Sequence, residues 1–159
     1  MSTKENKITS KHKYFMKLAF NQARKILGNT GENPAVGCVV VKKNILINLS
    51  HTNIGGKPHA ERIALSKKNI NFRNSNLYTT LEPCSHYGKT SPCTNIIKSK
   101  LLNSVYYSKS DPDKRSFKKA KIILSDHGIN VFDNIYKSEG DYFYKDFYLR
   151  KKTNRIFIT

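Results

Sequence analysis

The feature that most constrains this fold is a set of potential metal ligands that lie far apart in the chain. His59 is followed two residues later by Glu61, and Cys84 and Cys93 come later, with eight residues between them. A catalytic zinc ion takes three protein ligands and leaves a fourth position for water. A fold that uses these residues for zinc must therefore bring one imidazole and two thiolates to the same point.

The surroundings of the cysteines separate two of them from the third. Pro92 precedes Cys93 and is expected to open a helix, whose positive dipole end favours the thiolate that zinc requires. Cys84 also follows a proline in a polar stretch, whereas Cys38 lies inside an apolar run and is expected to be a buried strand residue. We therefore predict His59, Cys84 and Cys93 as the metal ligands.

Glu61 is predicted to be the catalytic carboxylate. As a fourth ligand it would close the open position, but left free it can take a proton from water and pass it to a ring nitrogen and a leaving amine. Two thiolates balance the charge of zinc. The zinc ion lowers the pKa of the water bound to it toward neutrality. The pattern H-x-E followed by P-C is typical of zinc-dependent nucleobase deaminases. The sequence thus predicts a zinc-dependent hydrolase.

The hydrophobic pattern predicts an α/β fold. Apolar residues recur at helical spacing over residues 12–27, and Gly28 supplies a stop. Two strand-like runs, 36–41 and 45–49, are joined by Lys43-Asn44 as a hairpin. This order predicts a mixed sheet between helices, a three-layer α/β/α sandwich. The remaining expected elements are helices at 58 to about 68, 92 to about 99, 116–124 and 139–149, and strands at 77–81, 105–107, 129–132 and 155–159.

Length and composition fit one folded domain. The chain has 159 residues, of which 38% are hydrophobic. Residues 1–10 are polar and lack the apolar core of a secretory signal, and no stretch reaches the length of a membrane span. We therefore expect a flexible tail at 1–10, a deaminase domain at 11–150, a cytoplasmic location and no membrane association.

The formal net charge of +18 has two interpretations. A nucleic-acid partner is one of them. The other is compositional drift together with a small anionic substrate, and the residue types favour it. Lysines are spread over the whole chain and far outnumber arginines, whose planar guanidinium groups suit phosphate better. We therefore do not expect a nucleic-acid partner.

Longer motifs resemble the deaminase domain of the bifunctional riboflavin biosynthesis protein. That family carries N-P-x-V-G, H-A-E, T-L-E-P-C-S-H-x-G-[KR]-T-x-P-C and D-P-[ND]. This sequence has NPAVG at 33–37, HAE at 59–61, TLEPCSHYGKTSPC at 80–93 and DPD at 111–113. In cytidine and tRNA deaminases the two cysteines are typically two residues apart, so the longer spacing favours the riboflavin family. The resemblance extends from about residue 12 to the C-terminus.

The resemblance implies a cytidine-deaminase-like fold, one zinc ion per chain and a substrate. The substrate is the phosphorylated diaminopyrimidine ribotide 2,5-diamino-6-(5-phosphoribosylamino)pyrimidin-4(3H)-one, deaminated to 5-amino-6-(5-phosphoribosylamino)uracil and ammonia. The implied substrate contacts are Asn33 in the base pocket, Lys89 at the ribose phosphate, Asp111 and Asp113 at the sugar-phosphate end, and also His86 and either Thr52 or His51.

The sequence also departs from the family. Lys118-Lys119-Ala120 stands where the family has Gly-Lys-Gly, so the backbone path there is expected to differ. Residues 155–159 resemble the first strand of the family's NADPH-dependent reductase domain, and we expect that domain to be absent. We expect residues 151–159 to be a remnant of that domain, and the chain to lack reductase activity and to depend on a separate reductase.

Two alternative functions stay open. A nucleic-acid base deaminase would need a cleft wide enough for a polynucleotide. A non-enzymatic zinc module that binds RNA or protein would need a fourth ligand, for which His86 between the two cysteines is the candidate. We further expect a homo-oligomer, although no motif specifies one.

Overall fold

The sheet begins with the hairpin that the sequence predicts. The computed structural model describes residues 8–154, and in it β1 (Gly37–Lys42) pairs antiparallel with β2 (Ile45–His51). Lys43 and Asn44 between them both have positive φ angles, 50° and 64°. Two such residues form the tight turn whose twist matches that of paired strands.

Three further strands complete a mixed sheet of five strands in the order β2-β1-β3-β4-β5. β3 (Asn76–Leu81) is antiparallel to β1, whereas β4 (Ser104–Lys109) and β5 (Asn130–Phe132) continue parallel to β3. The parallel strands end at the same edge of the sheet, which is where ligand sites form in open α/β sheets. Residues 82–93 and 110–116, which follow β3 and β4, therefore meet at this edge.

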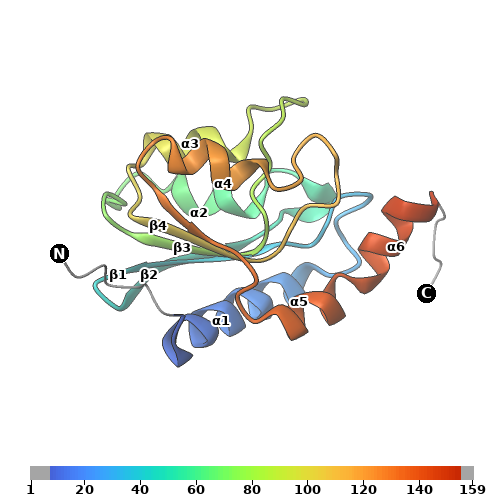
Figure 1. The fold of residues 1–159 in the computed structure, drawn as a ribbon, viewed down its shortest axis with the longest axis horizontal. Helices are drawn as coiled ribbons and strands as arrows, with labels where there is room; N and C mark the ends of the chain where they lie inside the picture. The colour runs from blue at the N-terminus through green and yellow to red at the C-terminus, as the bar shows by residue number, and fades with distance from the viewer. Residues whose placement is uncertain (1–7, 155–159) are drawn as a thin grey trace.

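Helices cover both faces of the sheet (Figure 1). One layer contains α1 (Ser10–Ile26), α5 (Lys137–Phe143) and α6 (Lys145–Thr153), and the other contains α2 (Ala60–Leu65), α3 (Cys93–Ser99) and α4 (Lys119–Ser125). A short 3-10 helix, η1 (Ile54–Gly56), precedes α2. Because the central strands β1 and β3 are covered on both sides, nearly all of their residues are buried. The α/β/α sandwich predicted from the sequence is confirmed.

The contact between α1 and β1 depends on Gly37. A Cβ atom at this position would lie 1.9 Å from the Ala19 carbonyl oxygen and 2.6 Å from the Ala23 nitrogen, both backbone atoms of α1. Glycine therefore allows the helix backbone to rest directly on the strand. Gly28 ends the same helix as predicted, with a φ angle of 86° that favours glycine.

Two predicted helices have different bounds. The helix expected over 58 to about 68 is α2, which begins at Ala60 with His59 as its N-cap and ends at Leu65. The polar residues after Leu65 are exposed, so they offer no apolar face whose packing would extend the helix. The helix expected over 116–124 is α4, which begins only at Lys119, because Lys118 before it has a φ angle of 56°.

The single helix expected over 139–149 is two helices, α5 and α6. They meet at Tyr144, whose backbone leaves helical geometry (φ −95°, ψ 7°). Its side chain is almost fully buried, and its hydroxyl group donates a hydrogen bond to the Ala35 carbonyl oxygen at 2.8 Å. The break lets this side chain enter the core while α6 continues past the end of the sheet.

Some predictions fall outside the residues that the structure describes. These are most of the tail expected at 1–10 and the strand expected at 155–159. Residues 151–153, expected to belong to a domain remnant, form the last part of α6. Among the described residues, no helix has the length and apolar character that a membrane crossing needs.

Candidate metal centre and substrate pocket

His59, Cys84 and Cys93 come together at the ends of three elements. His59 caps the start of α2, Cys84 follows β3, and Cys93 is the first residue of α3. The His59 Nδ1 atom lies 3.6 Å from Cys84 Sγ and 3.5 Å from Cys93 Sγ. A tetrahedral zinc ion with its usual bond lengths separates a nitrogen and a sulfur ligand by about 3.5 Å. The three groups are therefore spaced as zinc ligands.

The electrostatics of the two thiols suit a site for a cation. The Cys93 backbone N–H donates to Cys84 Sγ at 3.3 Å. Hydrogen bonds from Cys93 and His59 lower the pKa of the Cys84 thiol to about 4, although burial opposes this shift. The pKa of Cys93 is raised because it shares a hydrogen bond with the Cys84 thiolate and is buried. The hydrogen bond to Cys84 also raises the pKa of His59.

Glu61 lies beside this cluster without belonging to it. Its side chain is buried, Oε2 lies 3.7 Å from Cys93 Sγ, and the Thr79 hydroxyl group donates to Oε1 at 3.4 Å. Burial raises the pKa of this carboxyl group to about 7, although His59 opposes the shift. A buried carboxyl group that has few hydrogen-bond partners and lies next to a set of metal ligands can accept and return a proton near neutral pH.

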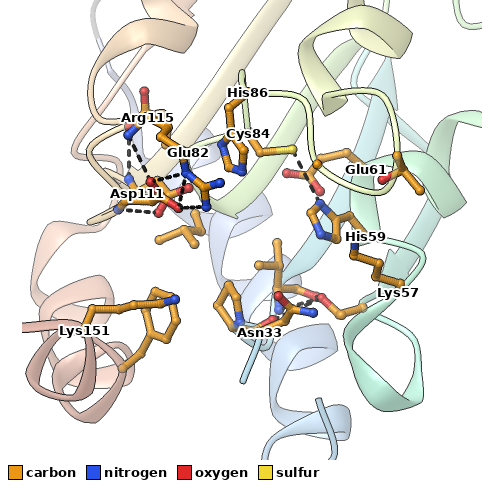
Figure 2. A pocket seen from close by; sticks show the side chains of 18 residues that line it. Asn33, Lys57, His59, Glu61, Glu82, Cys84, His86, Asp111, Arg115 and Lys151 are labelled. Carbon is orange, nitrogen blue, oxygen red and sulfur yellow. Dashed lines mark hydrogen bonds and ion pairs between the residues drawn. The ribbon is translucent and has the colours of Figure 1, made fainter. Parts of the chain in front are cut away.

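A cavity of about 250 Å³ opens onto the cluster, and Figure 2 shows the side chains around it. Most of the residues that the sequence predicts for the site line this cavity. Its lining residues are Asn33, Pro34, Val36, Thr52, Lys57, His59, Glu61, Leu81, Glu82, Cys84, His86, Gly88, Thr90, Asp111, Asp113, Arg115, Phe147 and Lys151.

Asn33 and Thr52 line the wall of this cavity near η1. The Asn33 side-chain amide donates to the Gly56 carbonyl oxygen at 3.4 Å. The Thr52 hydroxyl oxygen accepts a hydrogen bond from the Val36 N–H at 3.0 Å. His51, the alternative to Thr52, does not line the cavity, and its Nδ1 lies 2.8 Å from the Thr52 carbonyl oxygen. Of the two, Thr52 is therefore the residue that lines the cavity.

His86 lines the cavity but is not part of the cluster of potential metal ligands. Among the described residues, the cluster consists of His59, Cys84 and Cys93. His86 Nδ1 is instead 2.7 Å from the hydroxyl oxygen of Ser116, which also accepts a hydrogen bond from the Ser85 N–H at 3.1 Å. The side chain proposed to close a structural zinc site is therefore held by a different partner.

Asp111 and Asp113 lie on the segment that follows β4. Asp111 Oδ1 accepts a hydrogen bond from the Asp113 N–H at 2.9 Å, and burial raises the pKa of Asp111. Both carboxylate oxygens of Asp113 are bound by Arg115, whose Nη2 is 2.6 Å from Oδ2 and whose Nε is 3.0 Å from Oδ1. This pairing holds the pKa of Asp113 well below its usual range.

Glu82 is a pocket residue for which the sequence predicts no role. Its buried carboxylate accepts backbone hydrogen bonds from Asp111 and Lys118 at 3.0 Å each and from Ala120 at 3.2 Å. Burial raises its pKa, while the three N–H donors oppose this shift. Glu82 thereby joins the Asp111 segment to the start of α4. Its place between a strand and Cys84 in the T-L-E-P-C motif was the available clue.

Lys89, predicted to meet the phosphate, is exposed and does not line the cavity, although its neighbours Gly88 and Thr90 do. The lysine and arginine residues that line it are Lys57, Arg115 and Lys151, and no sequence motif indicated any of the three. Lys151 reaches the cavity only because α6 returns to it, and no local pattern indicates such a contact.

A buried chain of hydrogen bonds holds α6 against the pocket. The Gly37 N–H donates to the Thr80 hydroxyl oxygen at 3.1 Å, and the oxygens of Thr80 and Tyr144 are 2.6 Å apart. Because Tyr144 donates to Ala35, it accepts the hydrogen bond from Thr80. This chain joins β1, β3 and the start of α6, and so positions Phe147 and Lys151 at the cavity wall.

Comparison with known proteins now places the fold and the site in a class. Residues 9–109 match the family described as the cytidine and deoxycytidylate deaminase zinc-binding region. The matched segment contains the three clustered groups and Glu61. The sandwich and its cavity are thus those of a cytidine-deaminase-like enzyme.

Individual relatives narrow the class. The chain is 36% identical over 140 residues to the diaminohydroxyphosphoribosylamino-pyrimidine deaminase of Buchnera aphidicola, covering 88% of this chain and 95% of that protein. It is 37% identical over 147 residues to the riboflavin biosynthesis protein RibD of Aquifex aeolicus, covering 92% of this chain and 41% of that protein.

A solved structure agrees with these relatives. The diaminohydroxyphosphoribosylaminopyrimidine deaminase/5-amino-6-(5-phosphoribosylamino)uracil reductase of Thermotoga maritima superimposes with a TM-score of 0.87 at 35% identity, covering 93% of this chain and 43% of that one. The chain therefore belongs to the cytidine and deoxycytidylate deaminase family, and within it to the diaminohydroxyphosphoribosylaminopyrimidine deaminases of riboflavin biosynthesis. It spans about two fifths of the length of the Aquifex and Thermotoga proteins.

Proposed function

We propose that this chain hydrolyses the 2-amino group of 2,5-diamino-6-(5-phosphoribosylamino)pyrimidin-4(3H)-one and releases ammonia. The observation that carries the proposal is the position of Glu61, buried beside the ligand cluster but outside it. The names of the Buchnera and Thermotoga relatives support this substrate.

The chemistry of the clustered groups fits zinc. One imidazole nitrogen and two thiols, one of them with a lowered pKa, form a set of borderline-soft donors that zinc prefers over magnesium or calcium. His59, Cys84 and Cys93 would hold the ion and leave a position facing the cavity. When bound there, zinc supplies a Lewis acid that makes water a nucleophile near neutral pH.

Glu61 moves the protons of the reaction. Water adds to the ring carbon that carries the 2-amino group, and Glu61 takes a proton from the water and passes it to the adjacent ring nitrogen. A second proton passes through the same carboxyl group to the amine. The carbon–nitrogen bond then breaks, ammonia leaves and a carbonyl group remains on the ring. Glu61 ends the cycle in its starting form.

The cavity orients the ring for this attack. Pro34, Val36 and Leu81 supply an apolar wall for the pyrimidine, while the polar groups of Asn33 and His86 lie where they can meet its amino and carbonyl groups. Buried polar groups of a ligand need such partners, because each one left unpaired costs about 1–3 kcal/mol.

The direct test is to incubate the zinc-loaded protein with the ribotide and to measure ammonia, with Glu61→Gln as the matched control. We expect equimolar ammonia and uracil product from the wild type and almost none from the variant. Zinc-loaded, folded wild-type protein that releases no ammonia would contradict the proposal.

The alternative substrate is a nucleic-acid base, which the net charge of +18 favours. This alternative predicts deamination of cytidine or adenosine in RNA and an affinity that falls steeply with salt concentration. The same ammonia assay with RNA in place of the ribotide distinguishes the two substrates, and we expect no ammonia from RNA.

A further inference from the structure

The cavity has two chemically different sides. His59, Cys84 and Glu61 lie on one side of it in Figure 2, whereas Arg115 and Lys151 lie on the opposite side. If the proposed function holds, the reacting carbon lies next to Glu61. A ribose phosphate attached to the far side of the pyrimidine then extends toward Arg115 and Lys151.

Arg115 is held in place while keeping free donors. Its Nε and one Nη2 donor are directed to Asp113, which leaves three of the five guanidinium N–H groups for other partners. The side chain is 65% exposed, while that of Asp113 is only 20% exposed. Asp113 thus fixes the plane of the guanidinium group, and a planar group in a fixed orientation suits the bidentate binding of phosphate.

Lys151 adds a positive charge that is not paired with an acidic side chain of the described residues. Within residues 8–154, none of the salt bridges involves this side chain, which lies 5.8 Å from the centre of the Phe147 ring. Lys151 also borders a second cavity of about 710 Å³, which Lys114, Lys145, Lys152 and Asp141 line as well. Because Lys151 lines both cavities, it is the lysine that brings positive charge to the wall of the first one, and positive charge attracts anions.

We propose that Arg115 and Lys151 form the subsite that binds the substrate's phosphate group, and that they select phosphorylated over dephosphorylated substrate. This proposal rests on the proposed function for the position of the ring. It differs from the prediction for Lys89, because that side chain is exposed and does not line the cavity.

The test compares Arg115→Ala and Lys151→Ala with two matched controls. Lys114→Ala and Lys152→Ala each remove a neighbouring charge that borders the second cavity but not the first. For each zinc-loaded protein, kcat/KM is measured with the ribotide and with its dephosphorylated riboside. We expect kcat/KM for the ribotide to fall about tenfold or more in Arg115→Ala and about three- to tenfold in Lys151→Ala, since charge-assisted hydrogen bonds of this kind are the strong ones. The riboside should change by less than about twofold.

Three results would overturn the proposal. Equal losses for ribotide and riboside would mean that the two residues shape the pocket without binding phosphate. Equal losses in the Lys114→Ala and Lys152→Ala controls would mean that only the overall charge matters. A selective loss in Lys89→Ala, with Arg115→Ala unchanged, would assign the phosphate to the loop between the two cysteines.

A binding measurement keeps this test independent of turnover. The wild type and the four variants are titrated with ribose 5-phosphate and with ribose, and nuclear magnetic resonance shifts are followed. We expect the wild type to bind ribose 5-phosphate more tightly than ribose, and this preference to disappear in Arg115→Ala. Such a result without any ammonia release would support the phosphate subsite while contradicting the proposed function. Ammonia release without the preference would do the reverse.

Discussion

Tyr144→Phe removes only one hydroxyl group, but we expect it to lower the stability of the protein strongly. The hydroxyl group is buried, donates to the Ala35 carbonyl at 2.8 Å and accepts from the Thr80 hydroxyl group at 2.6 Å. Phenylalanine preserves the ring packing but leaves the Ala35 carbonyl group without the Tyr144 donor and the Thr80 hydroxyl group without an acceptor, while Thr80 keeps the bond from the Gly37 N–H. The unpaired carbonyl group costs about 1–3 kcal/mol and the lost bond from Thr80 about 1 kcal/mol more, so we expect the free energy of unfolding to fall by about 2–4 kcal/mol.

The assay is urea unfolding of the zinc-loaded protein, monitored by circular dichroism. In thermal unfolding, a loss of this size should lower the melting temperature by roughly 4–16 °C for a domain of this length. Tyr142→Phe is the matched control, because Tyr142 is 79% exposed, and it should change stability by less than about 0.5 kcal/mol. The zinc content should stay the same in both variants. If Tyr144→Phe were as stable as Tyr142→Phe, the buried hydrogen bonds would not hold α6 in place.

Three further predictions concern the metal, the packing and the pH dependence. Cys93→Ala should lose zinc, whereas Cys38→Ala, which removes a buried strand thiol, should retain it, as metal analysis will show. If Cys38→Ala lost zinc as well, the ligand set would be wrong. Gly37→Ala should unfold at much lower urea than Gly88→Ala, because its Cβ atom would lie 1.9 Å from a backbone oxygen, while that of Gly88 would meet nothing within 4 Å. Equal unfolding midpoints would contradict the packing of α1 on β1. Burial, and secondarily Lys11, lower the pKa of His12, so the unfolded chain binds a proton that the folded chain refuses. The wild type should therefore lose stability relative to His12→Phe as the pH falls below about 6.5. A stability difference that does not change with pH would refute this.

The sequence predicts elements best where local patterns decide them. The hairpin at Lys43 and Asn44 and the stop at Gly28 depend on local backbone conformation, and the structure confirms both. The break at Tyr144 is different. Residues 139–149 suit one helix locally, and only the hydrogen bond to Ala35, more than a hundred residues away along the chain, directs the side chain into the core.

The same distinction applies to the site. His59, Glu61, Cys84 and Cys93 stand in motifs whose spacing carries chemical meaning, and the structure brings all four together. Arg115 and Lys151 stand in no motif. They reach the cavity because the segment after β4 turns back at Asp113 and because α6 passes the end of the sheet. Residues that a fold adds from distant segments could not be found from local spacing.

The most direct test of the proposed zinc-dependent deamination is one experiment on Glu61→Gln. We measure bound zinc and the rate of ammonia release from the ribotide, for the variant and the wild type under the same conditions. We expect both proteins to bind one equivalent of zinc, and the variant to release ammonia at least about 10²- to 10⁴-fold more slowly, since it has lost its proton-transfer group. Loss of zinc would make Glu61 a ligand, and an unchanged rate would assign the proton transfer to another residue. Either result would contradict the proposed mechanism.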